Sequence, residues 1–235
     1  MVGRWRGEGA QHQGARPYQE DSWALRALGD GSLLAVVADG MGGHAGGAVA
    51  SRVAVEAFVH AVEQGGGLSD GLREANDAIG REAAGKAALA GMGATLVAVQ
   101  VRDDEVRWIS VGDSPLFLVA SGELERLNAD HSMAPQIEAL VKRGVLTAEE
   151  AEHHPGRHTL REAVMGEPIS LIDKGSRRLG PDVKLLLCSD GVQSLSATEI
   201  AVAAIRPAAR LVEAVLAAAR EHQDNVTVVR LERER

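Results

Sequence analysis

The sequence has few of the residues that mark several common protein classes. Its 235 residues include one cysteine, Cys188, so no disulfide can form within the chain. Aromatic residues make up 3% against 45% hydrophobic residues, so the core must be built from valine, leucine, isoleucine and alanine. No apolar run reaches the roughly 18 residues that a membrane span requires, and no signal-peptide hydrophobic region follows the N-terminus. These absences predict a cytoplasmic protein.

The chain also lacks a positive charge excess and any internal repeat. Its formal net charge is −8, which argues against nucleic acid or an anionic membrane as the main partner. There is no low-complexity linker and no strong shift in composition along the chain. We therefore expect one catalytic domain over residues 1–235, and a monomer, because no exposed apolar stripe is evident.

Three apolar, strand-like runs each deliver an aspartate beside a glycine. The runs span residues 33–40, 106–113 and 183–191, and their aspartates are Asp39, Asp113 and Asp190. Carboxylates gathered at the ends of strands repel one another and are costly to desolvate unless cations lie among them. Oxygen ligands of this kind suit hard divalent ions such as Mg²⁺ or Mn²⁺. The pattern therefore predicts a metal-dependent hydrolase.

The order of the expected elements favours two sheets with helices outside them over a doubly wound parallel sheet. The pattern predicts helices over residues 48–62, 69–84 and 207–221. It predicts strands over residues 21–28, 33–39, 94–101, 105–111, 115–120, 183–188 and 226–231. The connections among the strands between 94 and 120 are short, which indicates an antiparallel meander. Residues 130–166 are polar, broken and charged, so we expect a surface flap there.

Seven short motifs follow one another along the chain. They are Arg16, Glu20-Asp21, Asp39-Gly40, Gly93-Ala94-Thr95, Gly112-Asp113-Ser114, Ser189-Asp190-Gly191 and Asp224-Asn225. Their order and spacing resemble those of the metal-dependent serine/threonine protein phosphatases of type 2C, in their compact bacterial form. The resemblance covers roughly residues 8–231. It implies an α+β fold with four layers, α/β/β/α, in which helix pairs flank a sandwich of two antiparallel sheets.

The resemblance implies two core ions, Mn²⁺ or Mg²⁺, and a set of ligands for them. Asp39 would bridge the two ions, and Gly40 would offer its backbone carbonyl to one of them. Asp190 and Asp224 would complete the shell of one ion, and Glu20 would ligate the other.

Further residues of this site follow from the same resemblance. Asp21 would hold metal-bound water, and Asp113, together with Asp190, would bind a possible third and weaker ion. Arg16 would grip the substrate phosphate through its planar, bidentate fork. His44 is a candidate proton donor to the leaving oxygen, although a packing role in the glycine-rich loop and a metal-bound water as the donor remain alternatives.

The chain departs from the family pattern at three positions. Gln19 stands where asparagine is common, and Pro115 stands where arginine often follows Gly-Asp-Ser, which removes a positive charge near the third-ion site. Met41 occupies the position of a histidine that is proposed as the general acid in eukaryotic relatives. His153, His154 and His158 are expected to serve the flap or the surface.

The predicted reaction is hydrolysis of phosphoserine and phosphothreonine monoesters in proteins. Two ions about 3.5–4 Å apart acidify a bridging water to hydroxide and aim it in line at phosphorus. No covalent phosphoenzyme is needed, and the chain has no Cys-x5-Arg loop, because Ser194 lies six residues after Cys188. The expected partners are phosphorylated proteins and an opposing serine/threonine kinase. A catalytically silent phosphoprotein-binding module and a small-molecule phosphohydrolase remain as alternatives.

Overall fold

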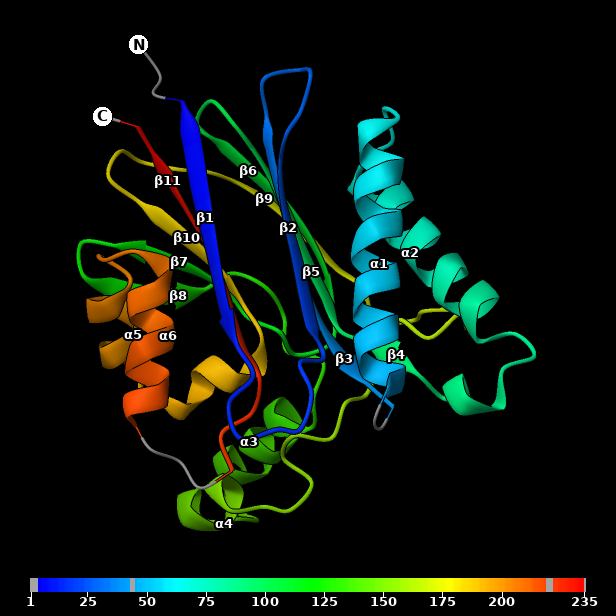
Figure 1. The fold of residues 1–235 in the computed structure, drawn as a ribbon. Coiled ribbons are helices and arrows are strands. Elements are labelled where there is room, and N and C mark those ends of the chain that lie inside the picture. The colour runs from blue at the N-terminus through cyan, green and yellow to red at the C-terminus, as the bar shows by residue number, and fades with distance from the viewer. Residues whose placement is uncertain (1–3, 43–44, 219–221, 235) are drawn as a thin grey trace.

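The strands form two antiparallel sheets that lie face to face (Figure 1). The computed structural model describes residues 4–42, 45–218 and 222–234. The five-stranded sheet has, in spatial order, β1 (Trp5–His12), β11 (Val226–Arg233), β10 (Lys184–Cys188), β7 (Leu116–Ala120) and β8 (Glu123–Arg126). The six-stranded sheet has β2 (Asp21–Ala27), β3 (Leu33–Met41), β5 (Leu96–Arg102), β6 (Glu105–Val111) and β9 (Asp173–Arg178), with the short β4 (Gly93–Ala94) paired to β3.

Helix pairs cover the two outer faces of this sandwich. In Figure 1, α1 (Ala45–Glu63) and α2 (Leu68–Ala83) lie on the six-stranded sheet, whereas α5 (Ala197–Ala203) and α6 (Ala208–Ala217) lie on the five-stranded sheet. Short 3-10 turns occur at Ala87–Leu89 and Asp190–Ser194. The predicted four-layer α/β/β/α arrangement is confirmed.

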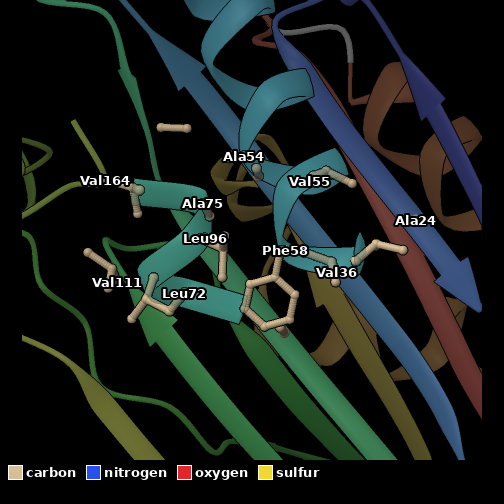
Figure 2. Close-up of a cluster of buried hydrophobic side chains, with 14 of the residues drawn as sticks. Ala24, Val36, Ala54, Val55, Phe58, Leu72, Ala75, Leu96, Val111 and Val164 are labelled. Atoms are coloured by element: carbon tan, nitrogen blue, oxygen red, sulfur yellow. The ribbon is translucent and has the colours of Figure 1, made fainter. Parts of the chain in front are cut away.

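Strand β3 shows why the core divides into layers. Successive side chains of a strand point to opposite faces of the sheet, so Leu34 and Val36 pack toward α1 and α2, whereas Ala35 and Val37 pack between the sheets. Figure 2 shows Val36 beside the ring of Phe58, a fully buried residue of α1. Both faces are covered, which explains why this strand reads as an unbroken apolar run rather than an alternating one.

The flap predicted over residues 130–166 is a separate lobe at one end of the sandwich. It contains α3 (Ala134–Lys142) and α4 (Ala148–Glu152), and Figure 1 places both at the end opposite the start of β1. Its two ends pair with each other, because Met133 N donates to Thr159 O at 2.9 Å and Arg161 N donates to His131 O at 2.8 Å. The flap is therefore tied at its base to the sandwich end.

Some elements differ from the sequence expectations. β1, β8 and β9 carry no apolar pattern and were not expected, and α6 ends at Ala217, with residues 219–221 of the expected helix outside the described part of the chain. Cys188 packs in the core below α5 and α6, where burial raises the pKa of its thiol well above the ordinary value. Among the residues that the structure describes, no helix is both long and apolar enough to cross a lipid bilayer.

Candidate metal and phosphate site

Carboxylates from five separated segments meet at the flap end of the sandwich. Asp39 lies near the end of strand β3, next to Asp21 at the start of β2, and their Cα atoms are direct partners in the sheet. The other segments follow β6, follow β10 and precede β11. They border a cleft of about 430 Å³ whose acidic lining residues are Glu20, Asp39, Asp113, Asp190 and Asp224. The structure thus brings together the carboxylates that the motifs predicted.

Burial and the repulsion of neighbouring carboxylates disfavour the charged forms of Asp39, Asp113 and Asp190. Burial is the main cause that raises the pKa of Asp39 well above its usual range, and the charges of Asp21 and Asp190 raise it further. Burial, followed by the charge of Asp190, also raises the pKa of Asp113 to about 7. Such a set of oxygen donors is relieved by hard divalent cations. The chemistry of the donor set therefore fits the predicted ions.

The backbone at Gly40 approaches its neighbours too closely for a side chain. A Cβ at this position would overlap the carbonyl oxygen of Gly47 at the start of α1 and would lie 2.6 Å from the carbonyl oxygen of Glu20. Gly40 N also donates to Glu20 O at 3.1 Å. This close approach holds the segments of Asp39 and Glu20 against each other and leaves Gly40 lining the cleft.

Asp21 joins the ends of the two sheets. Its Oδ2 accepts hydrogen bonds from Ser189 Oγ at 2.8 Å and from Thr227 Oγ1 at 2.7 Å. Ser189 follows β10 and Thr227 lies in β11, so both donors belong to the end of the five-stranded sheet. Ser189 Oγ in turn accepts from Thr227 N at 2.9 Å. Burial raises the pKa of Asp21 to about 7, against the effect of these two hydroxyl groups. Asp21 is thus fixed from the side of the five-stranded sheet.

A second buried network links Asp39 to the Asp113 turn. Thr95 N donates to Asp39 O at 2.9 Å, and Asp39 N donates to Thr95 Oγ1 at 3.2 Å. Thr95 Oγ1 also shares a hydrogen bond of 2.6 Å with Ser114 Oγ. Thr95 of the Gly93-Ala94-Thr95 motif therefore hydrogen-bonds beside the site and joins Asp39 to Ser114.

Arg126 supplies a positive charge next to Asp113. The arginine that often follows Gly-Asp-Ser in the family is replaced here by Pro115, so this charge comes from a different part of the chain. The Arg126 guanidinium donates to Asp113 O at 2.8 Å and pairs with Asp130 at 2.9 Å, and its charge opposes the rise in the pKa of Asp113 that burial causes. The sequence analysis did not identify this residue. The spacing of Arg126, Asn128 and Asp130 was a usable signal, because alternate residues of an extended segment share one face.

Arg16 lies at the rim of the cleft, on the loop between β1 and β2. Its Nη2 donates to Asp224 Oδ2 at 2.5 Å. Asn225, which is 4% exposed, fixes the backbone of this loop. Its Oδ1 accepts a hydrogen bond from Glu20 N, and its Nδ2 donates to Gln13 O and Tyr18 O. Arg16 and Glu20 are therefore positioned by the residue next to Asp224.

The histidines fall into different places. His44, the candidate proton donor, lies outside the described residues. His131 is buried and accepts a hydrogen bond from Gly112 N at its Nδ1, 3.3 Å away, which agrees with a structural role. His158 is an exposed flap residue, but it also lines the cleft, separately from His153 and His154. Sequence spacing gave no signal that distinguished it from those two.

Across residues 4–42, 45–218 and 222–234, no three histidine, cysteine, aspartate or glutamate side chains are gathered tightly enough to hold an ion by themselves. The acidic residues instead line the wall of the cleft together with Gly40, in the last part of β3, and Arg16.

Comparison with known sequences identifies the family. A sequence profile described as Protein phosphatase 2C matches residues 7–226. The chain belongs to the protein phosphatase 2C family. It is 34% identical over 212 residues to the serine/threonine protein phosphatase PstP of Mycobacterium tuberculosis, covering 85% of this chain and 40% of that relative's length. It is 30% identical over 234 residues to the serine/threonine phosphatase stp of Listeria monocytogenes, covering 93% and 92%.

Solved structures of 2C phosphatases share the fold. The crystal structure of PstP from Mycobacterium tuberculosis superimposes with a TM-score of 0.83 at 31% identity, covering 98% of this chain and 99% of that one. The catalytic domain of PstP in complex with two manganese ions gives a TM-score of 0.80 at 31% identity, with 97% of each chain covered.

Proposed function

We propose that this chain is a metal-dependent phosphatase that hydrolyses phosphoserine and phosphothreonine in proteins. One observation carries the proposal: carboxylates from five segments border one cleft with Arg16 at its rim, and burial together with neighbouring carboxylates raises the pKa of Asp39, Asp113 and Asp190. The names of relatives in two bacterial genera agree with it. The chain spans less than half of PstP's length, so the activity of that whole relative reaches this chain only as a proposal.

The residues divide into ion-binding and substrate-binding groups in this proposal. Asp39, Asp190 and Asp224 would hold one core ion, Asp39 and Glu20 would hold the other, and the Gly40 carbonyl would bind one of the two, either Mn²⁺ or Mg²⁺. When bound, such ions supply a nucleophile from water at neutral pH and offset the charge of the phosphoryl oxygens.

Residues around these ligands would orient the reactants. Asp21, fixed by Ser189 and Thr227, would orient water at the ions. Arg16 would hold two phosphate oxygens, and Asp113 would contribute to a third, weaker ion with Asp190. Proton donation by His44 remains a prediction, as do the single catalytic domain over 1–235, the monomeric state, the cytoplasmic location and an opposing serine/threonine kinase.

The test uses chelator-stripped protein and a phosphothreonine peptide, with and without Mn²⁺. We expect turnover only with the ion and none in Asp39→Asn. The matched control is Asp103→Asn, an exposed aspartate in the turn at the far end of β5, whose positive φ asparagine tolerates. Binding of Mn²⁺ without turnover of any phosphate ester would favour the phosphoprotein-binding module. Turnover of small phosphate esters but of no phosphopeptide would favour the small-molecule phosphohydrolase.

A further inference from the structure

Arg16 and Asp224 form an ion pair within the proposed site. The Nη2–Oδ2 distance is 2.5 Å, and the side chains are 52% and 39% exposed. The two residues have separate roles in the proposed function, on which this inference rests: Arg16 binds substrate phosphate, and Asp224 binds an ion. Arg16 can therefore bind either phosphate or Asp224, and Asp224 can bind either an ion or Arg16.

The backbone of the Arg16 loop is held in place next to Asp224. Ala15 N donates to Gln223 O at 2.8 Å, and Gln13 Nε2 donates to Arg16 O at 2.6 Å. Gly14 has a φ of 65° and packs against the carbonyl of Asp224 so closely that a Cβ would overlap it. Because the backbone is fixed, an exchange of partners needs only rotations within the long Arg16 side chain.

The charges around Arg16 explain why it turns inward. Its hydrogen bond to Asp224 raises the pKa of its guanidinium, and the charges of Glu20 and Asp190 add to this effect against the cost of burial. A guanidinium near these three carboxylates offsets part of the repulsion among them. A divalent ion would offset the same repulsion more strongly, because it carries twice the charge and binds the oxygens directly.

We infer that Arg16 competes with the metal ion for Asp224, so that ion binding displaces the guanidinium and frees its fork for the phosphate. The coupling is reciprocal in binding free energy, so an ion at Asp224 favours phosphate at Arg16 and phosphate favours the ion. Phosphate binding by Arg16 is therefore coupled to occupancy of the metal site. Asp224 links the two events because it is the shared partner.

The inference predicts the sign of a change in metal affinity. Exposed ion pairs of this kind are modest in strength, and removal of Arg16 also removes repulsion between its charge and the ion. Together these effects should tighten Mn²⁺ binding by about two- to tenfold in Arg16→Ala. The charge of Arg16 contributes to this change with or without a contact to Asp224, so displacement of the guanidinium is followed separately by NMR, as described below.

Isothermal titration of metal-free protein with Mn²⁺, without substrate, tests this directly. Two variants are measured, Arg16→Ala and Arg16→Gln, so that the test still stands if one of them fails to fold. The matched control is Arg6→Ala, which also removes an exposed arginine paired with a carboxylate, Glu232 at 2.6 Å, at the other end of β1. Tighter binding in both Arg16 variants and not in the control is the expected result.

A second measurement follows the guanidinium itself. The side-chain NMR signal of Arg16, assigned by its loss in Arg16→Ala, should move toward that of a solvent-exposed arginine as Mg²⁺ is added. Equal or weaker ion binding by the Arg16 variants, or a signal that Mg²⁺ does not move, would overturn the inference while leaving the phosphatase proposal intact. Failure of the wild-type chain to bind either ion would overturn both.

Discussion

Substitution of Asn225 should show how far the site depends on the support of its loop, because Asn225 fixes the loop that carries Arg16 and Glu20. Its side chain makes three hydrogen bonds to the backbone of the loop between β1 and β2, at 2.7 Å to Glu20 N, 2.7 Å to Gln13 O and 3.0 Å to Tyr18 O. Asn225→Ala removes all three from a buried position. At about 1 kcal/mol net for each bond, the loss is about 3 kcal/mol.

This loss has a thermal and a functional consequence. In a domain of this size, 1 kcal/mol corresponds to about 2–4 °C, so the melting temperature of the metal-free protein should fall by about 6–12 °C. The loop that carries Arg16 and Glu20 would also lose its support, so Mn²⁺ affinity should fall and the KM for a phosphopeptide should rise. Calorimetric melting, Mn²⁺ titration and steady-state kinetics measure the three effects.

Asn76→Ala is the matched control for this experiment. Asn76 on α2 also makes three hydrogen bonds, to Glu167 O, Met165 N and Gly166 N, but on a loop behind the six-stranded sheet. It should lose stability while keeping its Mn²⁺ affinity. If Asn225→Ala kept the affinity of the wild type despite a lower melting temperature, Asn225 would not position the site, and the reasoning would be refuted.

Three further predictions concern the carboxylates and their supports. Burial raises the pKa of Asp21 and Asp113 to about 7, so the folded metal-free protein binds more protons than the unfolded chain between about pH 4 and 7. Its stability should therefore fall as the pH rises from about 4 to about 7 and level off above that, and saturating Mg²⁺ should abolish this fall in thermal melts. Gly40→Ala should cost about 3 kcal/mol or prevent folding in urea titrations, whereas Gly29→Ala, which has open space around its Cβ, should cost nothing. Ser189→Ala removes a hydrogen bond to Asp21 and should cost about 1–3 kcal/mol; an unchanged urea midpoint would contradict the role assigned to that network.

Two of the strands that the sequence did not predict, β1 and β9, share a physical cause. β1 contains two glycines at positions that other side chains fill: a Cβ on Gly7 would lie 2.5 Å from Leu231 Cδ2, and one on Gly9 would lie 2.6 Å from the Trp23 ring. In β9, Gly175 lies directly under the ring of Trp108. Large side chains of neighbouring strands cover these segments at their glycines. The apolar pattern of the segment itself does not contain these side chains, so it could not predict the strand.

The acidic residues of the site were predictable for the opposite reason. Each of Asp39, Asp113 and Asp190 lies at the end of an apolar run, Asp39 directly after it and the other two one residue further on, so the sequence alone placed them at strand ends. The residues that hold them were harder to find. Arg126 reaches Asp113 from the strand after next, and His158 reaches the cleft from the flap. Their roles depend on how distant loops meet, and the residue types alone permit many other partners.

The site also supplies part of the contact between the two sheets, which joins its stability to its function. Asp21 belongs to the six-stranded sheet, yet it accepts hydrogen bonds from Ser189 and Thr227 at the end of the five-stranded sheet. In the absence of an ion the same carboxyl group carries the cost of burial near other carboxylates. An ion that relieved this repulsion would therefore strengthen the junction of the sheets as well as prepare the reaction. Since ligands that bind the folded state stabilise it by mass action, metal binding and the integrity of this end of the sandwich should rise and fall together.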